Sequence, residues 1–409
     1  MTHSKKHTDS MPDAFIPYGR QSISEDDINA VVDVLRSDFL TQGPCVEAFE
    51  QAVAKKVDAH FAVAANSATS ALHMACLALG VTEGDRVWTS PNTFIASANC
   101  ARYCGAEVDF VDIDPHTYNL CADKLAEKLA HAKHNNTLPK VVIPVHFAGQ
   151  SCDMQAIHRL AQEYGFRIIE DASHAIGATY QQAYVGACQY SDICVFSFHP
   201  VKIITSGEGG MALTNQPHLA KQLRTFAHQG TTKCADELTQ TPGDWYYEQH
   251  ILGFNYRMTE MQAALGLSQL AKLDAFIDQR HQQFALYAEL LANLPITRPF
   301  QQDSGHSSLH LYPILLPSNI KNGQKVEPSA RKAIFDALRS ANIGTQVHYI
   351  PVHTQPYYQA LGFAWGDFPI AEDYYQRTLS LPLFVGLTSE QQERVVAVLA
   401  CALAEQGML

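Results

Sequence analysis

The most informative segment of the chain is Asp192-Ile193-Cys194-Val195-Phe196-Ser197-Phe198-His199-Pro200-Val201-Lys202. It starts as a short apolar run, which is typical of a strand buried on both faces of a parallel sheet. It ends on a lysine, and a glycine-rich segment that includes Gly207, Gly209 and Gly210 follows. A lysine at the end of a buried strand is partly desolvated and can act as a nucleophile. Because most lysines are exposed to solvent, this interpretation of Lys202 depends on the rest of the chain.

Similar apolar runs precede this stretch, and helical patterns separate several of them. The predicted strands cover residues 60–65, 86–89, 108–111, 140–145, 166–171 and 193–198. The predicted helices between them cover residues 70–79, 95–103 and 154–164. This alternation predicts an α/β fold with a mostly parallel sheet that is covered by helices on both faces.

The pattern changes after Gly210, where helices are predicted over residues 219–227 and 259–291. Beyond Pro295 and Pro299 the chain becomes α+β in character. The expected elements there are strands over 309–316 and 344–349, a helix over 329–340 and a closing helix from Thr388. We therefore expect a flexible lead-in over residues 1–15, a large domain over 16–295 and a small C-terminal domain over 296–409.

Composition excludes several classes of protein. The chain has 409 residues and a formal net charge of −12, which disfavours a nucleic-acid-binding or basic membrane-contact surface. Its ten cysteines form no Cys-x-x-Cys pair, so we interpret them as small buried residues in a reducing compartment and expect no metal site. The polar N-terminus is unlike a signal peptide, and no apolar run is long enough to span a bilayer. We expect a cytoplasmic location.

Three groups are expected to share the crevice at the carboxyl ends of the parallel strands. Asp171 and Lys202 each lie at or after a strand end, and Asn66-Ser67-Ala68-Thr69 follows a third strand and opens a helix. A helix start with small residues favours an anion. An amine, a carboxylate and a phosphate cradle together are what pyridoxal 5′-phosphate requires. Taken alone, Asp171 could instead cap a helix or bind a metal, and residues 66–69 could be a plain helix cap.

The ordered motifs resemble the DegT/DnrJ/EryC1/StrS sugar aminotransferases, which have the fold of type I pyridoxal-phosphate enzymes. The resemblance runs from about Ile16 to Leu399. It is carried by seven blocks: residues 66–72, 91–94, 145–149, 170–175, 197–202, 253–258 and 347–351.

This resemblance implies roles for individual residues. Lys202 matches the lysine that forms a Schiff base with the cofactor, and Asp171 matches the partner of the pyridine nitrogen. The other implied cofactor contacts are Ala68, Thr69 and Ser197 at the phosphate, Phe94 stacked on the ring, and His174 where many relatives carry glutamine beside the 3-hydroxyl. Asn255 matches a residue that reaches the phosphate from a second subunit, which implies a homodimer with shared active sites.

Within the family, the chain resembles the branch that acts in pseudaminic acid biosynthesis. This resemblance is carried by residues 16–21, residues 37–44 and the motif His199-Pro200-Val201-Lys202. That branch implies L-glutamate as the amino donor and C4 of a UDP-linked 4-keto-6-deoxy-N-acetylhexosamine as the acceptor. Candidate substrate-binding residues are Tyr18, Arg20, His310, Tyr312, His348 and Tyr349. The last two could equally be residues of a core strand.

Three other functions remain open at this point. One is an aminotransferase that acts on another nucleotide sugar, such as a dTDP-sugar, or at C3. Another is a sugar dehydratase of the same fold, although such relatives replace the lysine with histidine. A third is a non-catalytic regulator, which the intact lysine, aspartate and phosphate motifs disfavour.

Overall fold

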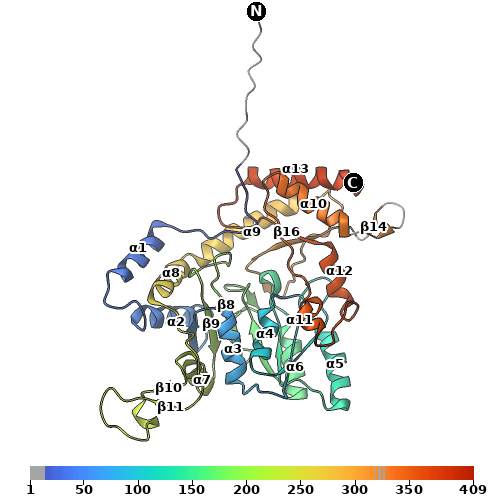
Figure 1. The fold of residues 1–409 in the computed structure, drawn as a ribbon. Helices are drawn as coiled ribbons and strands as arrows, with labels where there is room; N and C mark the ends of the chain where they lie inside the picture. Colours follow the sequence, from blue (N-terminus) through green and yellow to red (C-terminus); the bar gives the residue numbers. More distant parts are fainter. Residues whose placement is uncertain (1–13, 318, 321–323, 326–327) are drawn as a thin grey trace, which may run out of the picture.

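The computed structural model describes residues 14–317, 319–320, 324–325 and 328–409 (Figure 1). Residues 1–13 of the lead-in predicted over residues 1–15 lie outside the described residues. Within the described part of the chain, no helix is both long and apolar enough to cross a membrane.

A seven-stranded sheet forms the centre of the large body and confirms the predicted α/β class. Its strands, in spatial order, are β1 (Phe61–Ala65), β9 (Gly210–Thr214), β8 (Ile193–Ser197), β5 (Arg167–Asp171), β4 (Val141–Ile143), β2 (Arg86–Thr89) and β3 (Glu107–Phe110). All neighbouring pairs are parallel except those of β9, which runs antiparallel to both β1 and β8.

Strand β9 was not predicted, and it determines how two parts of the cleft meet. Gly210 pairs with Ala65 at the end of β1 and with Ser197 at the end of β8. The segment after β1 and the end of β8 therefore lie on either side of a single glycine.

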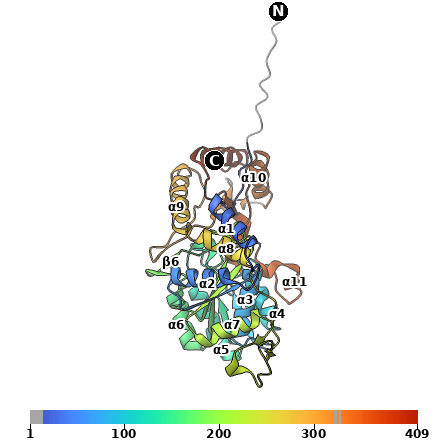
Figure 2. The ribbon, with the colours of Figure 1, turned by 90° about the vertical axis from the view of Figure 1, so that its left-hand side faces the viewer.

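Helices cover both faces of the sheet, as the sequence predicts (Figure 2). Three helices share one core with the strand side chains of one face: α3 (Ala68–Ala78), α4 (Ala96–Tyr103) and α7 (Pro217–Ala227). Three others pack on the opposite face: α2 (Pro44–Val57), α5 (Ala122–Asn135) and α6 (Met154–Tyr164). Strand β8 contributes to both faces, with Ile193 and Val195 on the first and Cys194 and Phe196 on the second. This explains its continuous apolar run.

A second core lies beyond one end of the sheet, near the top of Figure 1. It is built from α9 (Leu273–Leu290), α10 (Pro328–Ser340), α13 (Ser389–Glu405) and the antiparallel pair β13 (Tyr312–Leu315) and β16 (Thr378–Leu381). Ile16 and Tyr287 also belong to this core. The domain boundary at residue 295 stays a prediction, although α9 on its N-terminal side already packs against α13.

Two predicted elements differ from the structure. The helix expected over 259–291 is two helices, α8 (Glu260–Leu270) and α9, which are separated at Ala271 and Lys272. Residues 344–349 do not form a strand and make only an isolated bridge between Gln346 and Ser380. Helix α5 was not predicted. The capped start expected at Thr388 is confirmed, because the Thr388 side chain accepts a hydrogen bond from the Gln391 N–H.

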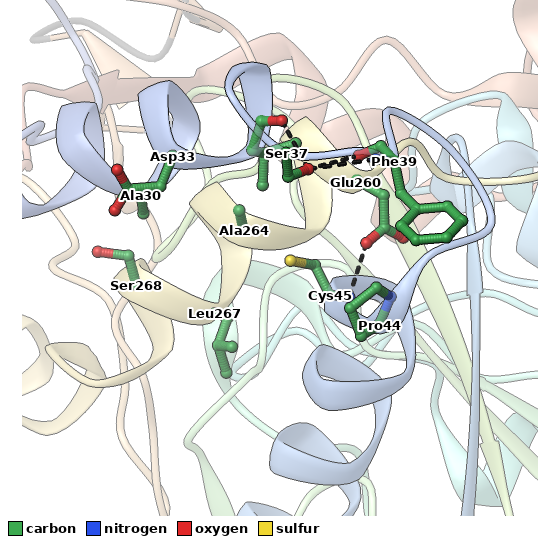
Figure 3. Close-up of a pocket in the computed structure, with 11 residues that line it drawn as sticks. Ala30, Asp33, Ser37, Phe39, Pro44, Cys45, Glu260, Ala264, Leu267 and Ser268 are labelled. Carbon is green, nitrogen blue, oxygen red and sulfur yellow. Dashed lines mark hydrogen bonds between the residues drawn. The ribbon is translucent and has the colours of Figure 1, made fainter.

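Helix α8 packs between α1 (Glu25–Leu35) and α2, beside a pocket of about 460 Å³ (Figure 3). Glu260 lies at the first position of α8 and is buried. Its carboxylate accepts hydrogen bonds from the N–H groups of Gly43, Cys45 and Val46, where α2 begins. A carboxylate at a helix start satisfies N–H groups that have no partner within the helix.

The remaining elements are short connections around these two bodies. They are β6 (Thr179–Tyr180), β7 (Ala183–Tyr184), β10 (Thr231–Thr232), β11 (Glu248–Gln249), β12 (Gly305–His306), β14 (Asn319–Ile320), β15 (Gln324–Lys325), α11 (Pro356–Gln359), α12 (Pro369–Arg377) and three single-turn 3-10 helices, Phe147–Gly149, Ala235–Glu237 and Val352–Thr354. The β10–β11 hairpin projects from the large body at the lower left of Figure 1.

Candidate active site

A cleft of about 1120 Å³ collects most of the predicted site residues. Those that line it are Tyr18, Ala68, Thr69, Phe94, Asp171, His174, Ser197, Lys202, His310, His348 and Tyr349. They come from strand ends β5 and β8, the start of α3, and loops of both bodies. The carboxyl ends of the strands therefore meet at one cavity, as expected for an open α/β sheet.

Lys202 lies in the turn after β8, where its N–H donates to the His199 carbonyl oxygen at 2.9 Å. Burial lowers the pKa of the Lys202 amine from 10.5 to about 8, although the negative charge of Asp171 acts in the opposite direction. This amine therefore loses its proton far more readily near neutral pH than a free lysine amine does, which favours its action as a nucleophile.

Asp171 ends β5 and is buried, with 4% of its surface exposed. Its Oδ2 accepts a hydrogen bond from the Ser97 hydroxyl at 2.5 Å. Its Oδ1 accepts from the Ser173 N–H at 3.1 Å and from the Ser173 hydroxyl at 2.6 Å. These bonds fix the orientation of the carboxylate from two sides, so that it is held in place at the wall of the cleft.

The start of α3 forms an anion cradle. The Ser67 side chain accepts from the Ser70 N–H at 3.1 Å, and the Ser67 carbonyl accepts from Ala71. The N–H groups of Ala68 and Thr69, at the first two helical positions, have no acceptor within the helix. A Cβ atom at Gly210 would lie 2.5 Å from the Ala68 nitrogen. The approach to these N–H groups is therefore open only because residue 210 has no side chain.

His174 is held as an uncharged ring. Burial and the nearby Lys202 lower the pKa of His174 well below its usual value. Its Nδ1 accepts from the Ala148 N–H at 3.3 Å, so the proton is on Nε2, which lies 3.1 Å from the Tyr349 hydroxyl. The ring centroids of His310 and His174 lie 4.4 Å apart, and burial also lowers the pKa of His310.

Phe94 is not a core residue. Its side chain is 58% exposed, lines the cleft and lies 6.4 Å from the Tyr349 ring, measured between centroids. An exposed aromatic face on a cavity wall is suited to stacking on a flat ligand. His348 is also at the cleft, where burial lowers its pKa to about 3, and its Nδ1 lies 2.8 Å from the Ser380 hydroxyl.

Three predicted site residues do not line this cleft. Tyr312 is 1% exposed and packs against Tyr287 and Phe284 in the second core, so its assignment to the substrate is corrected. Its alternating position on β13 points it into that core. Arg20 and Asn255 are exposed to solvent. The Asn255 carbonyl accepts a hydrogen bond from Asn66 at 3.4 Å, next to the cradle.

The sequence interpretation missed several groups that line the cleft or hold a residue that lines it. Ser97 holds Asp171 from α4, and no local signal connects it to a strand that begins 70 residues later. Ser173 lies two positions after Asp171, a spacing at which a hydroxyl commonly bonds a carboxylate. His199 and Glu208 also line the cleft, and their side chains lie 3.9 Å apart.

The residues present fit pyridoxal phosphate. The desolvated Lys202 amine can bind its aldehyde carbon, and the buried Asp171 carboxylate offers an acceptor to a protonated ring nitrogen. The N–H groups of Ala68 and Thr69 suit its phosphate. Phe94 supplies an aromatic face at the same cavity.

Comparisons with known proteins agree with this chemistry. Residues 21–400 match the model of the DegT/DnrJ/EryC1/StrS aminotransferase family, whose aminotransferases depend on pyridoxal phosphate. The chain is 39% identical to the spore coat polysaccharide biosynthesis protein SpsC of Bacillus subtilis, over 93% of this chain and 95% of that protein. It is 36% identical to the UDP-4-amino-4,6-dideoxy-N-acetyl-beta-L-altrosamine transaminase of Campylobacter jejuni, over 90% of this chain and 92% of that protein.

Solved structures are similar over the whole chain. Helicobacter pylori PseC, an aminotransferase involved in the biosynthesis of pseudoaminic acid, has a TM-score of 0.85 at 29% identity and covers 96% of this chain and 100% of its own. The PLP form of the putative sugar aminotransferase Spr1654 from Streptococcus pneumoniae has a TM-score of 0.85 at 27% identity and covers 97% of this chain and 100% of its own. The chain described here belongs to the DegT/DnrJ/EryC1/StrS aminotransferase family and is a sugar aminotransferase.

Proposed function

We propose that this protein binds pyridoxal phosphate and moves the amino group of L-glutamate to C4 of a UDP-linked 4-keto-6-deoxy-N-acetylhexosamine. The products are UDP-4-amino-4,6-dideoxy-N-acetyl-β-L-altrosamine and 2-oxoglutarate. The observation that carries the proposal is the joint placement of Lys202, with its lowered pKa, and the buried carboxylate of Asp171 in one cleft at the start of α3.

Two relatives support the choice of sugar. The Campylobacter jejuni relative is named as an altrosamine transaminase, and Helicobacter pylori PseC is described as acting in pseudoaminic acid biosynthesis. The same branch is favoured by the motif His199-Pro200-Val201-Lys202 and by residues 16–21 and 37–44.

The residues of the cleft have different roles in the proposed reaction. Pyridoxal phosphate, when bound, withdraws electrons and makes the hydrogen on the carbon beside the transferred nitrogen acidic. Lys202 would hold the cofactor covalently, and its amine, once released by the amino donor, would move the proton from that carbon. Asp171 is fixed by Ser97 and Ser173 and would offer its carboxylate to the ring nitrogen. Phe94, which lines the cleft, would stack on one face of the cofactor ring.

A homodimer would complete this site. Lys202 is the only lysine or arginine among the described residues that line the cleft, whereas the cofactor, glutamate and a UDP-sugar are all anionic. Asn255 is exposed next to Asn66, on the side of the cradle. A second copy that brings its own Asn255 segment to this side adds polar donors to the phosphate site.

The dimer can be tested by complementation. Lys202→Ala and Asn255→Ala are each expected to be nearly inactive, because each damages every site of a homodimer. When the two variants are co-expressed with random pairing, half of the dimers are mixed and each has one intact site, so activity should return to roughly a quarter of the native value. Absence of any recovery, although mixed dimers form, would exclude a shared site without affecting the proposed reaction.

The substrate is tested with a panel of UDP- and dTDP-linked 4-keto and 3-keto sugars. The purified protein is mixed with pyridoxal phosphate, glutamate and each sugar, and the new amine is located by NMR. We expect turnover with the UDP-linked 4-keto-6-deoxy-N-acetylhexosamine and a new amine at C4 with the configuration of the β-L-altrosamine product. Turnover confined to a different sugar would replace this substrate assignment.

A second candidate is amino transfer to another nucleotide sugar. The similarity to SpsC, at 39% identity, favours it, because that protein is named for spore coat polysaccharide rather than for pseudaminic acid. A single hydroxyl or methyl group changes few contacts in a sugar pocket. The same panel separates the two candidates.

A further inference from the structure

Arg280 on α9 is a buried cation that holds backbone carbonyl groups. The residue is 1% exposed, and its Nη1 donates to the carbonyl oxygens of Leu309 at 3.2 Å, His310 at 3.3 Å and Leu383 at 3.1 Å. Leu309 and His310 lie just before β13, and Leu383 lies just after β16. One guanidinium therefore joins α9 to two separate loop segments.

The charge of Arg280 has no acidic partner. Within the described part of the chain, no carboxylate pairs with the guanidinium, and its Nε is buried without a hydrogen-bond partner. Burial lowers the pKa of Arg280 to about 10, so the side chain stays protonated near neutral pH. A buried cation of this kind is costly for folding. We therefore looked for its value in the segments that it holds.

The first of these segments has a backbone that needs support from outside. Leu309 has a φ of 51°, a left-handed conformation that residues other than glycine rarely adopt. The His310 N–H donates to the Ala148 carbonyl oxygen at 2.8 Å, and the Ser308 hydroxyl donates to the His174 carbonyl oxygen at 2.8 Å. The segment is thus held by the large body through N–H and hydroxyl groups, and by α9 through its carbonyl groups.

His310 connects this segment to the cleft. Its side chain lines the cleft, and its ring centroid lies 4.4 Å from that of His174. No described residue forms a hydrogen bond with the His310 imidazole, and its Nδ1 is buried without a partner. The position of this ring therefore depends on the backbone that carries it and on its packing against His174.

We propose that Arg280 is a positioning residue for the reaction: it fixes the backbone of Leu309 and His310 and thereby sets the His310 ring against His174 in the cleft. Arg280 does not line the cleft itself, so it acts through His310. Without the guanidinium, the left-handed turn at Leu309 can relax and the His310 ring can turn away from His174. The inference deepens the proposed function, on which it rests for the cofactor and the amino donor.

The test uses the full chain saturated with pyridoxal phosphate. After mixing with L-glutamate, the loss of the visible absorbance of the bound cofactor gives the rate of the first half-reaction. L-Glutamine and L-aspartate are run in parallel, so that an error in the proposed donor does not affect the result. Arg280→Met should slow this rate on the order of 10-fold or more, because hydrogen bonds from a charged donor are lost. The visible circular dichroism of the bound cofactor should also change, and this readout needs no substrate.

Gln283 provides the matched control on the same helix. It is buried, and its Nε2 donates to the carbonyl oxygens of Phe384 at 3.0 Å and Leu387 at 3.1 Å, neither of which lines the cleft. Gln283→Met should lower the urea midpoint as Arg280→Met does, but keep the native rate and dichroism. Arg280→Lys keeps the charge on a single ammonium group and should fold, with a rate lower by roughly 5-fold. It replaces Arg280→Met if that variant does not fold.

A double variant shows whether Arg280 acts through His310. Adding Arg280→Met to His310→Ala should change the rate by less than about 2-fold, whereas independent effects would multiply. Native rates and dichroism in both Arg280 variants, equal slowing by Arg280→Met and Gln283→Met, or multiplied effects in the double variant would each overturn the proposal. If the native chain reacts with none of the three amino acids, the proposed function fails, and the dichroism comparison still decides the role of Arg280.

Discussion

The Ser97 hydroxyl donates a 2.5 Å hydrogen bond to Oδ2 of Asp171, which joins the first turn of α4 to the end of β5. Both residues are buried. Ser97 does not line the cleft itself, so it acts through Asp171. It is a positioning residue for the carboxylate that is proposed to face the ring nitrogen.

Ser97→Ala should weaken the binding of pyridoxal phosphate. Losing one hydrogen bond to a buried carboxylate costs about 1.5–3 kcal/mol, which corresponds to roughly a 10- to 100-fold rise in Kd. The Kd is measured by absorbance titration of cofactor-free protein. Ser191→Ala is the matched control, because Ser191 donates to Glu170, the neighbouring residue on β5, and should leave Kd unchanged. Equal Kd values for the two variants would show that Ser97 does not position Asp171.

Lys202→Ala and Lys202→Arg should both lose turnover and the visible absorbance of the bound cofactor. Alanine has no amine, and guanidinium stays protonated and is a poor nucleophile. Lys124→Ala, at an exposed lysine, serves as the control and should keep both signals. A Lys202 variant that retained native turnover would remove the amine from the mechanism.

Cofactor capture should depend on pH through Lys202. Because only the uncharged amine attacks an aldehyde, the rate should rise with pH and level off above about 8, the lowered pKa of Lys202. Asp171 raises that pKa, so Asp171→Asn should move the rise to lower pH. Stopped-flow absorbance after mixing cofactor-free protein with pyridoxal phosphate gives the profile. A rise centred near 10.5, as for a free lysine amine, would mean that the amine is not desolvated.

Gly210→Ala should block the phosphate cradle. The new Cβ would lie 2.5 Å from the Ala68 nitrogen and from Ser67 backbone atoms, which no relaxation of a flexible side chain can relieve. We expect cofactor affinity to fall by at least ~100-fold, in line with the loss of charge-assisted hydrogen bonds to the phosphate. Gly19→Ala, whose Cβ would meet only Val201 at an ordinary 3.8 Å, is the control. The titration used for Ser97→Ala also measures this effect.

Glu260→Ala should destabilise the fold without touching the cleft. The change removes the acceptor of the Gly43, Cys45 and Val46 N–H groups at the start of α2, of which Figure 3 shows Cys45 beside Glu260. Leaving buried donors unpaired costs about 2–3 kcal/mol. Urea unfolding should show a lower midpoint with an unchanged slope. Glu390→Ala, an exposed acid in the first turn of α13, is the control and should shift the midpoint little. A midpoint no lower than that of the control would contradict this role.

The strands and helices with strong local patterns were predictable. The apolar run 193–198 fits β8 because both faces of that strand are buried. Strand β9 was missed because its residues, 210–214, follow glycines that suggested a loop, and only pairing with β1 and β8 makes them a strand. Residues 344–349 have a strand-like composition, but their side chains serve the cleft and the second core instead of a ladder.

Candidate residues at the cleft followed from their positions after predicted strands and from the resemblance of whole motifs. Tyr312 was misplaced because a tyrosine in an apolar run can face either a core or a cavity, and periodicity alone does not distinguish them. No sequence pattern identified Ser97 as a site residue, because its partner Asp171 is far away in the sequence.

The sequence by itself determined the chemistry available to this protein: a lysine, an aspartate and a helix start, each placed after an apolar strand. Local patterns and motifs are sufficient for this, because strand ends of a parallel sheet meet at one edge. The charge, orientation and accessibility of these groups depend on the packed fold. Burial lowers the pKa of Lys202, Ser97 and Ser173 orient Asp171, and Gly210 leaves the cradle open. Desolvation and contact across long sequence separations are properties of the packed fold, and no local stretch of sequence encodes them.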